Sequence, residues 1–285
     1  MTSENPIQLS IKGIDIHGLE WGDPSGPKVL ALHGWLDNAE TFSKMAPKLK
    51  DCHVIAVDLP GHGLSGHWPA HQHYHVWAGV EDIEHILDSL GWEQCHLLAH
   101  SMGAAMATLY AGTFPDRVKS LTLIEALGPV SGEVESAPER LAKAILSMKD
   151  HNPEQKPREN TETFVQARLN GALKLEPGSA KRIVERGLTQ TNEGFIWSND
   201  KRLKYPSMMR LSEDLIASFI SKITCPVLGL FAEGGLFTKE TLNNRWQHLH
   251  CQHTLHWFKG THHLHIDGDV EELSDLVSEF IHQHI

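Results

Sequence analysis

Positive charge is scarce in this sequence. Its 285 residues include 25 Lys and Arg against 36 Asp and Glu, which gives a net charge of −11 at pH 7 with neutral histidines. The basic residues are scattered, and the tightest group is Lys201, Arg202 and Lys204. Because nucleic-acid binding depends on Lys and Arg that neutralise phosphates, this composition argues against a nucleic acid as a partner.

Long hydrophobic runs and paired cysteines are also lacking. No segment reaches the ~20 apolar residues of a membrane span, so none is expected. Residues 1–6 have neither the positive charge nor the apolar stretch of a signal peptide. The four cysteines, Cys52, Cys95, Cys225 and Cys251, show no CxxC spacing, which favours buried free thiols. We therefore expect a cytoplasmic protein.

Hydrophobic residues make up 40% of the chain and alternate between strand-like and helix-like patterns. Short runs that are apolar on both faces are typical of central parallel strands, which helices cover from both sides. A helix is expected at 76–90, with Gly91 as its C-cap. The expected strands are 7–11, 14–20, 29–32, 54–57, 96–99, 121–124, 227–231 and 253–258.

The pattern changes after residue 128. Strand signals almost vanish up to residue 222, and helical stretches alternate with polar loops that contain proline. The expected helices there are 138–148, 161–175 and 212–223, and a final amphipathic helix is expected at 270–281. This organisation predicts an α/β core, formed by 1–127 and 223–285, with a mostly parallel sheet and a helical cap inserted at 128–222.

The strongest chemical signal is LLAHSMGAA at 97–105. A strand leads into a turn with Ala99 and Gly103 on either side of Ser101, and a helix follows. A nucleophilic serine needs such a sharp turn, which lifts its hydroxyl above the sheet and tolerates only small neighbours. Since the motif alone also occurs by chance in strand-to-helix turns, the other motifs must decide.

A second motif, LALHGWLDN, lies at 30–38. A tetrahedral intermediate needs two backbone N–H donors, one from the residue after the nucleophile and one from the loop after the third strand. Met102 and Trp35 occupy these places and form the expected oxyanion hole. In the alternative interpretation the motif only makes a turn, with Trp35 as a buried anchor. The glycine-rich DLPGHGLS at 58–65 is interpreted as structural.

These motifs, followed by PVLGLFAE at 226–233 and KGTHHLHID at 259–267, resemble the α/β-hydrolase superfamily over nearly the whole chain. HGWLDN, IEALGP and FIWSNDKRL resemble its serine hydrolase-like subgroup. The resemblance implies an α/β-hydrolase fold with an eight-stranded sheet, a helical cap, no cofactor and a Ser–acid–His triad. Serine where haloalkane dehalogenases and epoxide hydrolases carry Asp argues for acyl transfer to water.

The resemblance places the base in KGTHHLHID. Thr261 stands in the second glycine position of the family pattern Gly-x-Gly-His-x-x-His, so His262 is the expected base and His263 the alternative. A metal site made of His262, His263 and His265 is not expected, because they lie too close together to converge on one ion without a distant fourth ligand. Histidines of a polar loop are expected at the surface: His71, His73 and His75.

The triad acid departs from the family. Relatives commonly carry Asp two residues past a Gly-Glu after the seventh strand, a place that Gly235 occupies here. Some cap-bearing relatives carry their acid at the end of the sixth strand, where this chain has Glu125. We therefore expect Glu125 as the acid, with Glu233 as the alternative.

The expected function is hydrolysis of a small carboxylic ester in a capped pocket. The expected substrate-binding residues are Trp35, Phe195, Trp197, Met208 and Met209. A thioesterase, a lactonase or a carbon–carbon bond hydrolase would use the same triad. A ligand-binding protein without activity is a further alternative, because the usual Asp is absent. A homodimer is left open.

Overall fold

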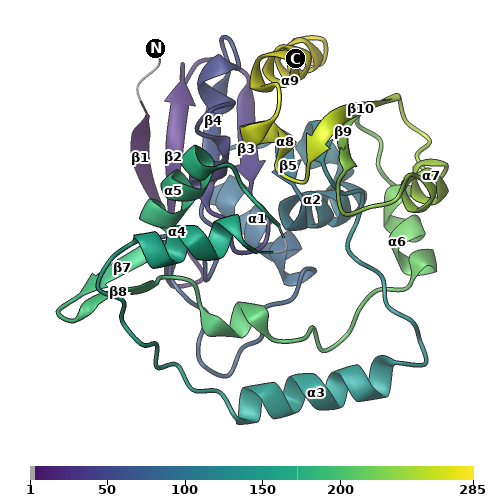
Figure 1. The fold of residues 1–285 in the computed structure, drawn as a ribbon. Coiled ribbons are helices and arrows are strands. Elements are labelled where there is room, and N and C mark those ends of the chain that lie inside the picture. Colours follow the sequence, from purple (N-terminus) through teal and green to yellow (C-terminus); the bar gives the residue numbers. More distant parts are fainter. Residues whose placement is uncertain (1–3, 172) are drawn as a thin grey trace.

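A computed structural model describes residues 4–171 and 173–285. An eight-stranded sheet with the order β1-β2-β4-β3-β5-β6-β9-β10 forms its centre (Figure 1). β2 is antiparallel to both of its neighbours, and the remaining pairs are parallel. The strands are β1 (Asn5–Ile11), β2 (Ile14–Gly22), β3 (Lys28–Leu32), β4 (His53–Val57), β5 (Cys95–His100), β6 (Val118–Ile124), β9 (Val227–Gly234) and β10 (His253–Thr261). The expected α/β-hydrolase fold with a mostly parallel sheet is confirmed.

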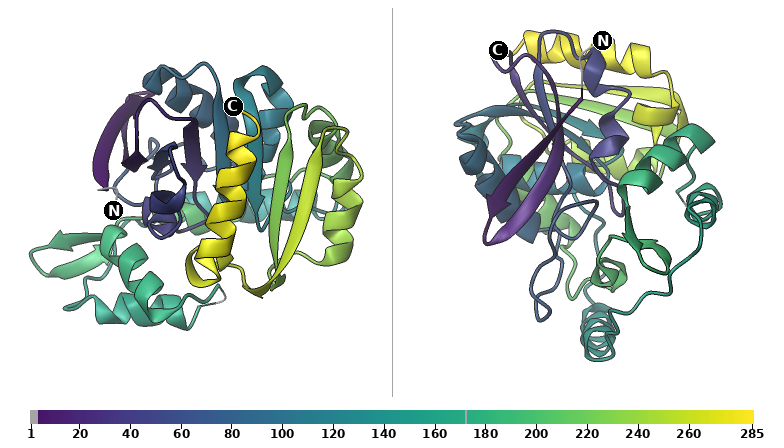
Figure 2. Two further views of the ribbon diagram at one scale, coloured as in Figure 1. Left: turned by 90° about the horizontal axis from the view of Figure 1, so that it is seen from above. Right: turned by 90° about the vertical axis from the view of Figure 1, so that its left-hand side faces the viewer.

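Helices cover both faces of the sheet (Figure 2). Leu30 and Leu32 pack into one hydrophobic cluster and Val29 and Ala31 into another, because successive side chains of a strand point to opposite faces. The first face is covered by α1 (Ala78–Leu90), α2 (Met102–Thr113), α6 (Glu213–Ile220) and α7 (Lys239–Trp246). The second is covered by η1 (Ala39–Phe42), η2 (Ala46–Lys48), α8 (Leu264–Asp267) and α9 (Val270–His282).

Several local expectations are confirmed. The helix expected at 76–90 is α1, and Gly91 ends it in the left-handed conformation with φ 65°. Cys52, Cys95 and Cys225 are buried free thiols, whereas Cys251 is half-buried. Within the described residues, no helix is both long and apolar enough to cross a bilayer.

Between β6 and β9, the part of the chain from α3 to η4 lies beyond the carboxyl ends of the parallel strands (Figures 1 and 2). It contains α3 (Ala137–Lys149), α4 (Glu162–Leu169), α5 (Pro177–Arg186), β7 (Leu188–Thr191), β8 (Gly194–Trp197) and η4 (Lys201–Lys204). A short 3-10 helix, η3 (Pro115–Arg117), leads into β6.

The structure differs from the sequence expectation in this segment. The helix expected at 161–175 ends at Leu169, and a separate helix begins with Pro177 at its first position. The hairpin of β7 and β8 was not expected, because its strands have only four residues each and show no alternation of buried and exposed side chains. α6 falls in the range expected for the cap but packs on α2. The boundaries of the cap at 128 and 222 therefore stay a prediction.

Gly103 allows α2 to approach β3 closely. A Cβ atom on Gly103 would lie 2.2 Å from the carbonyl oxygen of Leu32. Gly103→Ala should therefore lower the free energy of unfolding by roughly 1–3 kcal/mol, the usual cost of overpacking. Gly178→Ala is the matched control, because no described atom lies within 4 Å of its Cβ position. Denaturant unfolding measures both changes, and equal stabilities would contradict the prediction.

Candidate active site

Ser101 stands on a strained turn between β5 and α2. Its φ is 52° and its ψ is −112°, a conformation that a residue with a side chain rarely adopts and that costs about 1–3 kcal/mol. Hydrogen bonds hold the turn: the Ser101 N–H donates to the carbonyl of Ile124 at 2.9 Å, and the Gly103 N–H donates to that of His33 at 3.1 Å. The surrounding sheet thus fixes the direction of the serine side chain.

His262 lies in the loop between β10 and α8, next to Ser101. Its Nε2 is 2.9 Å from Ser101 Oγ, and its Nδ1 is 3.0 Å from Glu125 Oε2. His262 and Glu125 are both buried. A carboxylate only accepts hydrogen bonds, so Nδ1 carries the proton and Nε2 offers its lone pair to the serine hydroxyl. The structure therefore brings the three expected residues into one hydrogen-bonded chain.

The Glu125 carboxylate fills the space beside Gly235. A Cβ atom on Gly235 would lie 2.1 Å from Glu125 Oε2 and 2.6 Å from Oε1. Glu125 follows β6 directly with φ 62°, and the Ala232 N–H donates to Oε1 at 2.5 Å. Glu233, by contrast, is exposed. The Glu125 carboxylate thus fits only because residue 235 has no side chain.

The alternative base His263 points elsewhere. Its Nε2 lies 3.3 Å from Asp37 Oδ2, and its Nδ1 lies 3.3 Å from the carbonyl of Lys174. His265 is also buried, and its Nε2 is 2.7 Å from the hydroxyl of Thr41. Of the three neighbouring histidines, only His262 therefore has a hydrogen bond to Ser101 among the described contacts.

The two expected oxyanion-hole residues, Met102 and Trp35, lie near Ser101 in the structure. Met102 is the first residue of α2, where N–H groups have no acceptor within the helix. Trp35 follows β3, and both residues line the cavity that also contains Ser101. Trp35 is 43% exposed, and its indole N–H donates to the carbonyl of Leu203 at 2.8 Å, so Trp35 is not the buried anchor of the alternative interpretation.

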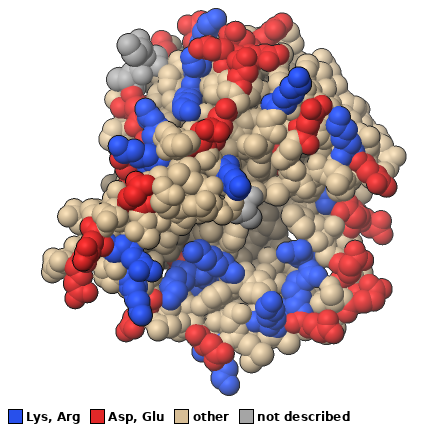
Figure 3. All heavy atoms as spheres, in the orientation of Figure 1, with Lys and Arg blue, Asp and Glu red and all other residues tan. Residues whose placement is uncertain are grey.

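The cavity above Ser101 has a volume of about 590 Å³. Figure 3 shows this face hollowed, with Lys and Arg side chains on either side of the hollow. Its walls are mostly apolar, and side chains that the sequence did not single out include Trp68, Tyr74, Met106 and Phe237. They belong to segments far apart in the chain, so no local pattern marks them.

Two of the expected substrate-binding residues, Trp35 and Met209, line this cavity, and the other three do not. Trp197 instead packs against Phe164, with ring centroids 5.0 Å apart. Phe195 packs against the same hydrophobic cluster, which contains Phe164 and is separate from the two clusters of the central sheet. The reason is the unexpected β7–β8 hairpin, which carries these aromatic residues. Met208 does not line the cavity either.

Two of the three loop histidines expected at the surface are placed differently. His71 is exposed, but His73 and His75 are half-buried, and His75 lines the cavity. The ring of His75 stacks between those of His73 and Trp77, with centroid separations of 5.6 and 4.6 Å. This aromatic stack covers part of the His75 ring and leaves it in the cavity wall.

The DLPGHGLS loop is held by a buried ion pair. Arg186 of α5 places its Nε 3.0 Å from both carboxylate oxygens of Asp58. Asp58 also accepts from the backbone N–H groups of Ala39 and Leu64, at 2.8 and 2.9 Å. These contacts support the interpretation that the loop has a structural role. The Asp58–Arg186 ion pair also anchors α5 to the core.

Comparisons with known proteins agree with this geometry. Residues 27–269 match the family described as alpha/beta hydrolase fold. The chain belongs to this family. It is 29% identical to a serine hydrolase-like protein of Danio rerio, over 94% of this chain and 85% of that protein. It is 30% identical to serine hydrolase-like protein 2 of Homo sapiens, over 81% of this chain and 76% of that protein. The expected resemblance to serine hydrolase-like proteins is thereby confirmed.

Solved structures give the same fold. The hypothetical protein PA1622 from Pseudomonas aeruginosa PAO1 is 33% identical, with a TM-score of 0.91, and the match covers 97% of this chain and 99% of that one. The thioesterase domain from the curacin biosynthetic pathway has a TM-score of 0.83 at 23% identity, a likeness that shows the fold alone.

Two histidines near the site should make stability depend on pH. Burial lowers the pKa of His33 to about 4, and burial together with His33 lowers the pKa of His62 to about 3. Below the ordinary value of 6.5 the unfolded chain binds protons that the folded chain resists. Stability should therefore fall as the pH drops from 7 to 5, by about 2 kcal/mol for each histidine.

Denaturant unfolding at the two pH values tests this. His62→Phe should reduce the loss, and His71→Gln, at an exposed position, is the control. A wild-type stability that is equal at both pH values would contradict the expectation.

Proposed function

We propose that this α/β hydrolase cleaves carboxylic esters through an acyl-enzyme, with Ser101 as nucleophile, His262 as base and Glu125 as acid. The observation that carries the proposal is the chain of contacts from Ser101 Oγ through both nitrogens of His262 to Glu125, at 2.9 and 3.0 Å. Ser101 opens into the mostly apolar cavity of about 590 Å³, where a small ester would bind.

The reaction begins when His262 Nε2 accepts the proton of Ser101 Oγ and the oxygen attacks the ester carbonyl. The carbonyl oxygen becomes an oxyanion, and the N–H groups of Trp35 and Met102 stabilise it. When the tetrahedral intermediate collapses, the bond to the alcohol breaks and the Nε2 proton moves to the leaving oxygen. Water then repeats the sequence, releasing the acid and restoring the serine.

Glu125 would supply two effects. Its carboxylate accepts the Nδ1–H bond and so fixes the tautomer in which Nε2 is free to act as base, and its charge stabilises the imidazolium that forms after proton transfer. The Ala232 N–H on Oε1 holds this carboxylate in place. A glutamate reaching across from β6 thus takes the role that an aspartate at residue 235 has in relatives.

Thioesters, lactones and carbon–carbon bonds next to a ketone are the other substrate classes that this triad could cleave. A panel of matched substrates with one acyl chain and different leaving groups separates them, because the acyl-enzyme is common to the oxygen and sulfur esters. The inactive ligand-binding alternative is separated by labelling with a fluorophosphonate, which bonds only to an activated serine.

Ser101→Ala should abolish fluorophosphonate labelling and lower ester hydrolysis by roughly 10⁶-fold, the loss known for removal of a triad serine. Ser207→Ala is the matched control, because Ser207 lines the same cavity without belonging to the triad. The control should retain labelling and activity. Labelling of Ser101→Ala at the wild-type rate would refute the assignment of the nucleophile.

Glu125→Gln should lower kcat by up to roughly 10⁴-fold, because the imidazole is then free to adopt the wrong tautomer. Glu233→Gln is the control, and since this side chain is exposed it should leave kcat nearly unchanged. The opposite pattern in the two variants would move the acid to Glu233.

The complementarity with Gly235 allows a rescue experiment. Gly235→Asp alone should clash with Glu125, given the 2.1 Å separation of its Cβ position from Oε2. In a Glu125→Ala background the space is free, and Asp at residue 235 should raise kcat at least tenfold over Glu125→Ala alone. If the folded double variant shows no increase in kcat, an acid at residue 235 does not reach His262.

A further inference from the structure

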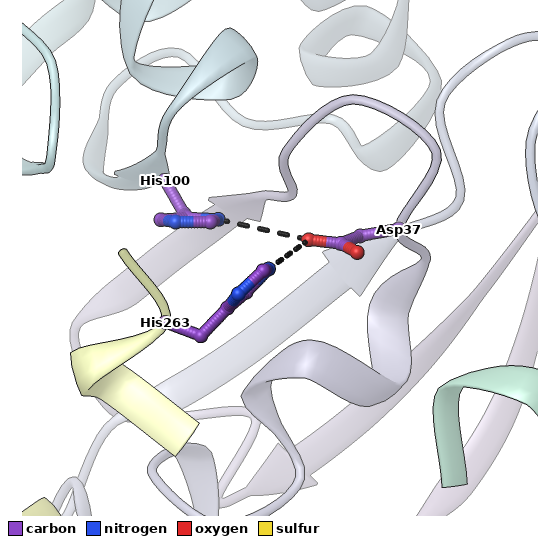
Figure 4. Close-up of side chains that lie close together, drawn as sticks. All are labelled: Asp37, His100 and His263. Atoms are coloured by element: carbon purple, nitrogen blue, oxygen red, sulfur yellow. Dashed lines mark hydrogen bonds and ion pairs between the residues drawn. The ribbon is translucent and has the colours of Figure 1, made fainter. Parts of the chain in front are cut away.

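A second cluster of polar side chains, two of which are sequence neighbours of Ser101 and His262, takes no part in the proposed reaction (Figure 4). Asp37 comes from the loop before η1, His100 ends β5, and His263 follows β10. All three are buried, and Asp37 Oδ2, His100 Nδ1 and His263 Nε2 lie within 4.8 Å of one another. Three groups that bind transition metals thus converge from distant parts of the chain.

The hydrogen bonds of His100 determine its tautomer. Its Nε2 is 2.9 Å from the carbonyl oxygen of His262, and since a carbonyl only accepts, Nε2 carries the proton. The other nitrogen, Nδ1, therefore presents a lone pair. It is buried, has no hydrogen-bond partner among the described residues, and faces Asp37 Oδ2 at 3.8 Å. A buried unsatisfied acceptor of this kind calls for an ion, a water molecule or a proton.

His263 is oriented in the same manner. Its Nδ1 is 3.3 Å from the carbonyl of Lys174, to which it can only donate, and its Nε2 faces Asp37 Oδ2 at 3.3 Å. Both partners only accept hydrogen bonds, so Nε2 donates to Asp37 when no ion is bound, and a bound ion would replace that proton and take up the Nε2 lone pair. Each imidazole thus gives one N–H to a backbone carbonyl and turns its other nitrogen toward the carboxylate, which is the usual arrangement of histidines that bind a metal.

Asp37 supplies the negative charge. Burial works to raise the pKa of this carboxyl group, but Arg168, His263 and His100 outweigh it and hold the pKa well below its usual range. Arg168 of α4 bonds to Oδ1, so Oδ2 remains available to the histidines. Carboxylates that ligate a metal through one oxygen are commonly hydrogen-bonded at the other.

We propose that Asp37, His100 and His263 form a binding site for a divalent transition-metal ion, with Zn²⁺ as the best match. Two imidazoles and one carboxylate suit Zn²⁺, whereas Mg²⁺ and Ca²⁺ prefer oxygen ligands. Tetrahedral bonds of ~2.0 Å place neighbouring ligand atoms roughly 3.3 Å apart. The observed separations from Asp37 Oδ2 are 3.3 and 3.8 Å, and all three ligand atoms lie within 4.8 Å of one another, so the two imidazoles must move toward each other to bind one ion.

The ion would not be a catalytic cofactor. Ser101, Glu125 and the ring nitrogens of His262 are not among its ligands, so the proposed triad does not need it. The site is connected to the base through His100, which bonds to the backbone carbonyl of His262, and through the peptide bond between His262 and His263. Bound metal would restrain the loop that carries His262.

Replacing Arg168 should change the metal affinity in the opposite direction to replacing a ligand. The positive charge of Arg168 is paired with Asp37 and repels a divalent cation bound to the same carboxylate. Removing Arg168 should therefore strengthen metal binding, whereas removing any of the three ligands should weaken it. A cluster that serves only to hold the fold together would show no such opposition.

The test is calorimetric titration of the chelator-treated protein with ZnCl₂, after long incubation because the site is buried. The wild type should show one equivalent of Zn²⁺ bound at least tenfold more tightly than the remaining sites. Asp37→Asn and His100→Gln should lose this equivalent, and Arg168→Gln should bind it at least threefold more tightly. His265→Gln, a buried neighbour outside the ligand set, and His71→Gln, at the surface, are controls that should retain it.

Circular dichroism checks the fold of each variant. If a ligand variant fails to fold, the visible spectrum of Co²⁺ bound to the wild-type protein still tests the proposal. We expect one equivalent of Co²⁺ in tetrahedral coordination, and Zn²⁺ should displace it. The proposal is overturned if wild type and ligand variants bind Zn²⁺ equally, if Arg168→Gln weakens binding, or if Co²⁺ shows only octahedral sites. Ester hydrolysis by the chelated protein, measured in parallel, separates this outcome from the fate of the proposed triad.

Discussion

The parallel register of the central strands is the constraint on which the rest of the site depends. Leu32 of β3 pairs with Ala99 of β5, and His100 of β5 pairs with Ile124 of β6. Because parallel strands end at the same edge, the residues that follow them meet there. The serine turn, the loop of the expected oxyanion hole and Glu125 are therefore neighbours. A shift of one residue in this register would separate them.

Backbone strain is concentrated at this edge. Both Ser101 and Glu125 have positive φ, at 52° and 62°, and each is the first residue after its strand ends. Such conformations persist only where the surroundings over-determine them. Here the backbone N–H groups of both residues donate to carbonyls of the neighbouring strands, at Ile124 and Leu230. Hydrogen bonds to the sheet thus stabilise the strained backbone that orients two side chains toward His262.

Buried ion pairs join the segment after β6 to the core. Asp37 and Asp58 are core carboxylates with almost no exposure, and their partners, Arg168 of α4 and Arg186 of α5, come from the inserted segment. An unpaired charge at such a site costs roughly 3–5 kcal/mol. The inserted helices supply the arginine partner of each carboxylate, so the electrostatics of the core and the position of these helices depend on each other.

The sequence by itself determined whatever depends on near neighbours. The strand runs, the small residues around Ser101 and the HGW turn predicted the sheet, the nucleophile position and the family, because these features act within a few residues of the chain. The contact of Glu125, and not of the exposed Glu233, with His262 is visible only in the tertiary structure, as is the lining of the cavity. So is the meeting of Asp37 and His100 with His263. In each case the deciding distance joins residues far apart in sequence, set by strand register and by docking of the inserted helices. The short β7–β8 hairpin, which removes Phe195 and Trp197 from the cavity, has no periodic pattern that could have revealed it.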